Sequence, residues 1–175
     1  MILLSWIYWK LVRSTSEETA VDILKHHSQN PHCPIRFIGF SHGGNVIKDI
    51  INILATEGIT NIDTLINFGT PIIPSQHSIN EDTPIGLHIN VFSPEDRTQT
   101  RLGSGSGLAR GGYWDYSADH NVRIAYNPEL FPIGDDHSFM HRNLDVWNQR
   151  IVPIINPITT PPQPVYIGGG VYMVP

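Results

Sequence analysis

Residues 34–48 read Pro-Ile-Arg-Phe-Ile-Gly-Phe-Ser-His-Gly-Gly-Asn-Val-Ile-Lys, and the predicted fold is organised around them. Its first half is a short run of strand-forming residues, and its second half begins an amphipathic helical pattern. The turn between them spells Gly-x-Ser-x-Gly, with Gly39, Ser41 and Gly43 at the fixed positions. We predict a sharp strand-turn-helix at Ser41. Glycine is expected two positions to either side because side chains there would collide with the neighbouring strand and helix.

Such a turn is typical of a nucleophilic serine. The strained backbone lifts the hydroxyl clear of the sheet edge, and the helix that follows directs its free N–H groups at negative charge forming on a substrate. His42 comes directly after the serine, so its backbone N–H is the expected first oxyanion donor. The alternative is a turn of small residues that buries an ordinary serine. The strand before Ser41 and the helix after it favour the first interpretation.

The composition is typical of one globular domain. The chain has 175 residues, 40% of them hydrophobic and 15% charged, which is enough to bury a core. The net charge of −5 and the lack of a basic run argue against nucleic acid as a partner. The single cysteine, Cys33, excludes an internal disulfide framework, and a structural thiol is its simplest interpretation. We expect no stable membrane insertion, because no run of about 18 apolar residues occurs, and no signal peptide is indicated at the start.

Strands are predicted to alternate with helices along the chain. The expected strands are residues 2–9, 35–39, 63–68, 87–92 and 121–126. The expected helices run from the capping-box pair Thr15 and Glu18 to Asn30-Pro31, over 43–57, and over 138–150.

The rest of the chain is predicted to be irregular. Residues 72–85 are expected to form a loop, and residues 101–119, which contain Gly-Ser-Gly-Ser-Gly, a long flexible excursion rather than packed structure. Together these segments predict an α/β fold over residues 1–152, a mostly parallel sheet with helices on both faces. A Pro- and Gly-rich tail over 153–175 is expected to follow.

Three residues that together suit nucleophilic catalysis come after predicted strands. The carboxyl ends of parallel strands meet at one edge of a sheet, so Ser41, Asp96 and His137 are expected to lie close together. A serine hydroxyl needs an imidazole to take its proton and a carboxylate to orient that imidazole, and Ser…Asp…His is one of the known chain orders. We predict Ser41 as nucleophile, His137 as general base and then acid, and Asp96 as the orienting acid. The alternatives are Glu95 for the acid, and His141 or His120 for the base.

A metal site and a phosphate-binding loop are the other interpretations of these motifs. His137 and His141 are four residues apart, a spacing that can place two ligands on one helix face. The glutamate of His-Glu-x-x-His is absent, because position 138 is serine, and no third ligand stands out. No lysine directly follows Gly43-Gly44, as a phosphate-binding loop requires. These motifs therefore predict neither a metal site nor a phosphate-binding loop.

Four segments together resemble an α/β-hydrolase: residues 39–45, the strand end Phe68-Gly69-Thr70-Pro71, the segment Phe92-Ser93-Pro94-Glu95-Asp96, and Asp136-His137-Ser138. The nearest group is lipase-like and includes lipase domains at the ends of bacterial polymorphic and contact-delivered toxins. The resemblance covers about residues 5–152. It implies hydrolysis of carboxylic, lipid-like esters through an acyl-enzyme intermediate, without a metal or an organic cofactor. The implied partner is a small-molecule or lipid ester. The expected substrate contacts are Phe40, Pro71 and Ile72.

The chain departs from this family before Ser41. An α/β-hydrolase has further strands ahead of the nucleophile strand, and one of them carries the loop with the second oxyanion N–H. Nothing before Ser41 predicts that loop, and loss of one oxyanion donor costs about 10²–10³ in rate. We therefore interpret the chain as part of a longer polypeptide, cytoplasmic or exported within that larger protein. The alternative function is a catalytically inactive hydrolase-fold fragment that acts as a binding module.

Overall fold

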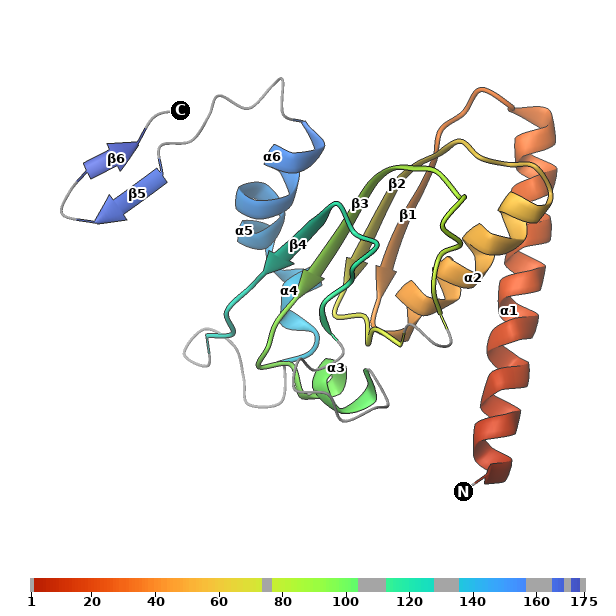
Figure 1. The fold of residues 1–175 in the computed structure, drawn as a ribbon, viewed down its shortest axis with the longest axis horizontal. Helices are drawn as coiled ribbons and strands as arrows, with labels where there is room; N and C mark the ends of the chain where they lie inside the picture. The colour runs from red at the N-terminus through yellow and green to blue at the C-terminus, as the bar shows by residue number, and fades with distance from the viewer. Residues whose placement is uncertain are drawn as a thin grey trace. The chain divides into compact units, whose positions relative to one another are not determined.

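The computed structural model describes residues 2–73, 77–103, 113–127, 136–156, 165–168 and 171–173, and side chains within the range 14–156. The chain divides into two compact units, Met1–Met140 and His141–Pro175, which are described separately. Figure 1 shows the elements of both.

The first unit begins with a long helix, α1 (Ile2–Gln29). The prediction of a strand at residues 2–9 and of a helix start at Thr15 is therefore wrong. No glycine, proline, asparagine or aspartate interrupts residues 2–21, so nothing ends a helix there, and tertiary context overrides the strand preference of aromatic and β-branched residues. Ser14 Oγ instead donates to Glu18 Oε1 at 3.1 Å, one turn on. The predicted end before Asn30-Pro31 is confirmed.

A four-stranded parallel sheet follows, in the order β1-β2-β3-β4. Its strands are β1 (Ile35–Phe40), β2 (Ile62–Phe68), β3 (Ile85–Phe92) and β4 (His120–Arg123). This confirms the α/β class and the four predicted strands, although β4 ends three residues before the predicted limit. Because every pair is parallel, all four carboxyl ends lie at one edge of the sheet, and the site is built at that edge.

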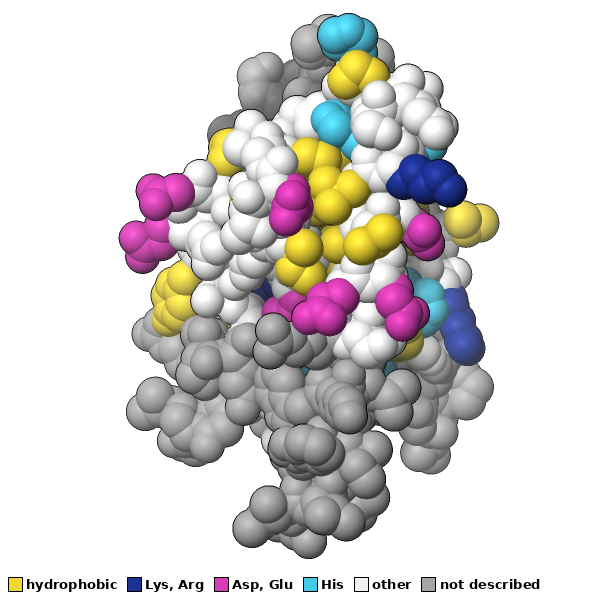
Figure 2. Space-filling view, turned by 90° about the vertical axis from the view of Figure 1, so that its right-hand side faces the viewer, with side chains coloured by type: hydrophobic (Ala, Val, Ile, Leu, Met, Phe, Trp, Pro, Cys, Tyr) yellow, Lys and Arg dark blue, Asp and Glu magenta, His cyan; other side chains and the backbone are white. Residues whose placement is uncertain are grey.

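Helix α2 (His42–Thr56) joins β1 to β2 and confirms the helix predicted over residues 43–57. Its apolar side chains pack with α1 and the sheet, and Figure 1 shows both helices on one side of the strands. Figure 2, which looks onto this side, shows hydrophobic side chains gathered between acidic ones. Helical cover on the other face stays a prediction. The buried members of this core are Ala20, Ile50, Ile51, Leu54, Ile59, Ile62 and Leu65.

The connection from β3 to β4 differs from its prediction. It begins with a short helix, α3 (Arg97–Leu102), and returns along residues 113–119 to the start of β4. Residues 104–112 of the predicted excursion lie outside the described residues. The described part is packed rather than loose, since Asp115 is 4% exposed and the ring of Tyr113 stacks on Phe92 with centroids 5.0 Å apart.

The last predicted helix is broken into short pieces. Helix α4 (Phe139–Arg142) ends before Asn143, whose side chain accepts from Asp145 N at 2.8 Å and so caps a new start. The pieces that follow are α5 (Leu144–Val146), the π-helical η2 (Trp147–Ile151) and α6 (Val152–Ile155).

Residues 74–76 and 128–135 are outside the described residues. Among the described residues, no helix combines the length and hydropathy needed to cross a bilayer.

The predicted tail contains regular structure. The predicted boundary after residue 152 falls inside α6, where Pro153 is tolerated because it lies in the first turn of that helix. Farther on, β5 (Val165–Gly168) and β6 (Val171–Met173) form an antiparallel pair.

Candidate active site

The turn between β1 and α2 holds Ser41 in a strained conformation. Its φ of 55° is positive, and no other non-glycine residue among those described has a positive φ. Side chains rarely adopt this region, so the surrounding structure must hold the residue there. Part of that hold is the bond from Ser41 N to the carbonyl of Phe68, at 2.8 Å. The turn at Ser41 is thus anchored to the end of the neighbouring strand.

Two close approaches of backbone make this turn possible, and they correct the predicted role of the glycines. A Cβ on Gly39 would lie 2.6 Å from the Cα of Gly44, so Gly39 is needed as expected. A Cβ on Gly43 would meet nothing within 4 Å, whereas one on Gly44 would lie 2.1 Å from Thr70 Oγ1. The prediction for Gly43 is therefore wrong. Gly43 points away from the sheet, and its neighbour Gly44 makes the tight contact.

Asp96 lies just past β3 and is completely buried. It caps α3, because its Oδ1 accepts from Thr98 N at 2.8 Å and from Gln99 N at 3.1 Å. The cap fixes the carboxylate plane and leaves Oδ2 for another partner. That partner is His137, whose Nδ1 is 2.7 Å from Oδ2.

His137 connects the carboxylate to the serine. Its Nε2 lies 2.7 Å from Ser41 Oγ, so one imidazole bridges the two oxygens. A carboxylate can only accept, so Nδ1 carries the proton, and Nε2 is then the acceptor for the serine hydroxyl. The ring is 19% exposed and packs against Phe40, with ring centroids 4.8 Å apart.

The alternative residues lie elsewhere. Glu95 Oε2 accepts from Ser93 Oγ at 2.7 Å, and Glu95 Oε1 lies 3.9 Å from Arg123 Nη2. These partners differ from His137, which contacts Asp96 instead. His120 begins β4 and therefore lies at the end of the strand away from the site. His141 belongs to the second unit. Ser41, Asp96 and His137 are the three that the structure brings together.

Gly69 contributes to the site, although no role there was predicted for it beyond its part in the family resemblance. It directly follows β2 with a φ of 59°, which favours glycine. A Cβ there would lie 3.3 Å from Asp96 Oδ2 and from His137 Cε1. The missing side chain therefore lets the carboxylate of Asp96 and the imidazole of His137 approach each other across the end of β2. The Gly-Thr-Pro after a predicted strand is the signal that could have identified it.

Gln99 also supports the site, and no local sequence signal identifies it. Its side chain is completely buried. Nε2 donates to the carbonyl of Thr70 at 3.1 Å, and Oε1 accepts from Ser93 N at 3.2 Å. It thereby ties the segment after β2 to the segment that carries Asp96.

The predicted substrate contacts have mixed surroundings. Phe40 is half-buried beside His137, where it can contact a bound group. Pro71 is buried, and its carbonyl accepts from Asn45 Nδ2 at 2.9 Å. Ile72 is 4% exposed and packs in the core. Phe40 is the only one of the three whose described contacts place it beside the Ser41–His137–Asp96 group.

His42 is the first residue of α2, so no carbonyl of that helix can accept its backbone N–H. This is the position expected of an oxyanion donor. Its imidazole lies edge-on to His77, with ring centroids 5.4 Å apart. Burial, with a further contribution from His77, holds the pKa of His42 below its ordinary value, against an opposing effect of Asp49.

We expect folding stability to fall as the pH drops below about 6.5, in part because of His42. The unfolded chain binds a proton at this residue near that pH, and the folded protein does so only at lower pH, so protons favour the unfolded state in between. Urea unfolding at about pH 7.5 and about pH 5.5 measures the loss, which should be smaller in His42→Gln. The exposed His26 supplies the matched control, His26→Gln. An equal loss in His42→Gln and wild type would contradict the prediction.

The described residues contain no group of three His, Cys, Asp or Glu side chains that could hold a metal ion. Comparison with protein-family models, with curated proteins and with solved structures finds no match to this chain in any of the three. What the site can do chemically follows from its own geometry.

Proposed function

We propose that this protein is a serine hydrolase that cleaves carboxylic esters through an acyl-enzyme intermediate. The observation that carries the proposal is the pair of 2.7 Å contacts through which His137 links Ser41 Oγ to Asp96 Oδ2. A serine hydroxyl becomes a useful nucleophile when a base can take its proton and a carboxylate orients that base.

In the first half of the reaction, Ser41 Oγ attacks the ester carbonyl carbon while its proton passes to His137 Nε2. The resulting oxyanion accepts a hydrogen bond from the backbone N–H of His42 at the start of α2. Asp96 stabilises the imidazolium without taking its proton. The C–O bond then breaks, the leaving alcohol takes the proton from Nε2, and the acyl group stays on Ser41.

In the second half, a water molecule gives a proton to His137 Nε2 and attacks the acyl carbon. The tetrahedral intermediate collapses, Ser41 Oγ recovers the proton, and a carboxylic acid leaves. His137 Nε2 therefore accepts and returns a proton in each half, first between Ser41 and the leaving alcohol and then between water and Ser41. No cofactor is required.

The arrangement of these residues supports an α/β-hydrolase fold. The nucleophile follows β1, the acid follows β3, and the histidine follows β4, all at the carboxyl edge of one parallel sheet. Phe40 beside His137 suits an apolar acyl group, so we propose lipid-like esters as the substrate class.

Hydrolysis of p-nitrophenyl esters of increasing acyl length tests this function. We expect turnover by the wild type that rises with acyl length before it levels off, and none above background for Ser41→Ala or His137→Ala. His120→Ala is the matched control and should keep wild-type activity, because His120 lies at the far end of β4. Folded wild-type protein that leaves every ester intact would contradict the proposal and would favour a binding module.

A further inference from the structure

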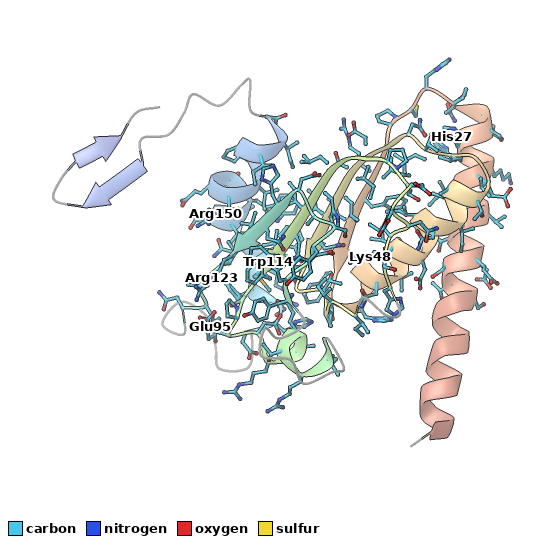
Figure 3. All side chains as sticks on the ribbon, in the orientation of Figure 1. His27, Lys48, Glu95, Trp114, Arg123 and Arg150 are labelled. Carbon is cyan, nitrogen blue, oxygen red and sulfur yellow. The ribbon has the colours of Figure 1, made fainter. Side chains whose placement is uncertain are left out.

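A buried ion pair lies between the nucleophile helix and the segment that precedes β4. Lys48 is 1% exposed and Asp115 is 4% exposed, and Lys48 Nζ lies 2.5 Å from Asp115 Oδ2. Figure 3 labels Lys48 on α2. Removing two charges from water is costly, and an apolar pair of similar volume often serves stability as well. Stability alone is therefore a weak reason for these two residues.

Lys48 lies on the face of α2 that begins at the nucleophile. Ser41, Gly44 and Lys48 are separated by three and four residues, which places them along one side of the helix. Gly44 lies against Thr70 and Asn67 at the end of β2. Lys48 lies one turn farther along α2, on the same side of the helix. A contact made by the ammonium group of Lys48 therefore influences the position of α2 and of the turn at Ser41.

Asp115 is held firmly on the other side. Its Oδ1 accepts from Ser117 N at 3.0 Å and from Ser117 Oγ at 2.7 Å. Its backbone N–H donates to Asn121 Oδ1 at 3.1 Å, and its carbonyl accepts from Asn121 Nδ2 at 2.8 Å. Asn121 belongs to β4, so the carboxylate that meets Lys48 is fixed to that strand.

A row of asparagines extends this connection across the sheet. Asn67 of β2, Asn90 of β3 and Asn121 of β4 are direct partners in the strand register. Asn90 Nδ2 donates to Asn121 Oδ1 at 2.8 Å and to the carbonyl of Tyr113 at 2.8 Å. The segments that follow these three strands carry Gly69, Asp96 and His137. The row therefore spans the three strands whose following segments carry the site residues other than Ser41.

His88 completes the layer. Its Nε2 is 3.2 Å from Asn67 Nδ2 and 3.7 Å from Asp115 Oδ2, and its Nδ1 is 3.1 Å from the carbonyl of Ser117. Burial lowers the pKa of His88, which favours a neutral ring. In that ring Nδ1 donates to the carbonyl of Ser117, and Nε2 accepts from Asn67 Nδ2. Burial alone would raise the pKa of Asp115, but Lys48 and the hydrogen bonds hold it below its ordinary value. Lys48 and Asp115 are thus the charged members of the layer.

We propose that Lys48 and Asp115 are positioning residues, which set the nucleophile helix against β3 and β4 and so hold Ser41 Oγ within reach of His137 Nε2. The inference rests on the proposed function. An ion pair suits this task because its attraction depends on distance and its hydrogen bonds on direction, whereas apolar packing specifies position less sharply.

The test is a double-mutant cycle read by the rate at which a fluorophosphonate labels Ser41, corrected for the folded fraction. Lys48→Met and Asp115→Asn singly leave one buried charge unpaired, so both melting temperature and labelling rate should fall. The double variant removes both charges and should regain the melting temperature, yet label at least about tenfold more slowly than wild type. A double variant that labels at the wild-type rate would overturn the inference.

Two further variants keep the test decisive. The matched control is the exposed ion pair of Arg36 and Asp63, whose Nε and Oδ2 atoms lie 2.6 Å apart. The Arg36→Met/Asp63→Asn protein should be labelled at the wild-type rate. Asp115→Glu keeps the charge and moves the carboxylate by one methylene. This variant should still fold, but the fluorophosphonate should label it more slowly than wild type. A wild-type labelling rate in this variant would also overturn the inference.

A second readout separates this inference from the proposed function. The ring N–H that His137 shares with Asp96 should give a strongly deshielded proton resonance in the wild type and in the control pair. We expect that resonance to weaken or shift in the Lys48→Met/Asp115→Asn protein. Wild-type protein that shows the resonance but never labels would refute the hydrolase and still test the positioning role. An unchanged resonance in the double variant would refute that role.

Discussion

Asp96→Asn should lower the rate of ester hydrolysis by about 10⁴ while leaving the protein folded. An asparagine amide turned with its oxygen toward α3 still accepts from Thr98 N and Gln99 N, so the helix cap is kept. Its NH₂ group then faces His137 Nδ1 and can only donate. The imidazole must accept there, its proton moves to Nε2, and Nε2 can no longer take the proton of Ser41.

The neighbouring carboxylate provides the control for this substitution. Glu95→Gln changes the same functional group one residue away, where it contacts Ser93 and Arg123 instead of His137. We expect its rate to stay within a few-fold of wild type. Equal losses in the two variants, or full activity in folded Asp96→Asn, would contradict the role given to Asp96. Steady-state kinetics and circular dichroism on the same samples measure both quantities.

Gly44→Ala should cost about 1–3 kcal/mol of folding free energy or more, and should also impair the site. The new Cβ would lie 2.1 Å from Thr70 Oγ1 and 2.8 Å from Asn67 Oδ1. These atoms belong to buried residues beside the end of β2, so α2 must move away from the sheet and take the nucleophile turn with it. Chemical denaturation gives the loss of stability, and ester hydrolysis gives the effect on the turn.

Gly43→Ala is the control for that prediction. The Cβ at this position meets nothing within 4 Å, and alanine is the better helix former by up to about 1 kcal/mol. Its stability should be unchanged or slightly raised, with activity kept. A tolerated Gly44→Ala together with a damaging Gly43→Ala would show that the contacts of α2 are assigned incorrectly.

The turn at Ser41 was predictable because its signals are local. A run of strand formers, a cluster of small residues and an apolar stripe at helical spacing stand next to each other in the sequence, and each is read without knowing the rest of the fold. The parallel sheet then follows from the alternation of strands and helices. It places the segments after β1, β3 and β4 at one edge, which is why Asp96 and His137 could be singled out.

The parts that failed depend on contacts between distant residues. Residues 2–9 have strand formers, but their continuity with a helix that packs on α2 decides their structure. The choice between Gly43 and Gly44 depends on where the side of α2 meets Thr70, which lies 26 residues farther on from Gly44 along the chain.

The burial of Asp115 was hidden for the same reason. Its partner Lys48 is 67 positions away, and a glycine-rich stretch between them predicts loose structure. Only the fold brings the ammonium, the carboxylate and the asparagine row together. The sequence could suggest which residues come together at the candidate site, but not which buried residues hold them in place.

Labelling of the wild-type protein with a fluorophosphonate, followed by identification of the modified peptide by mass spectrometry, shows whether Ser41 is a nucleophile. We expect one phosphonylated residue, Ser41, and no labelling of His137→Ala under the same conditions. Folded wild-type protein that stays unlabelled, or that is labelled at another serine while Ser41 stays unmodified, would contradict it.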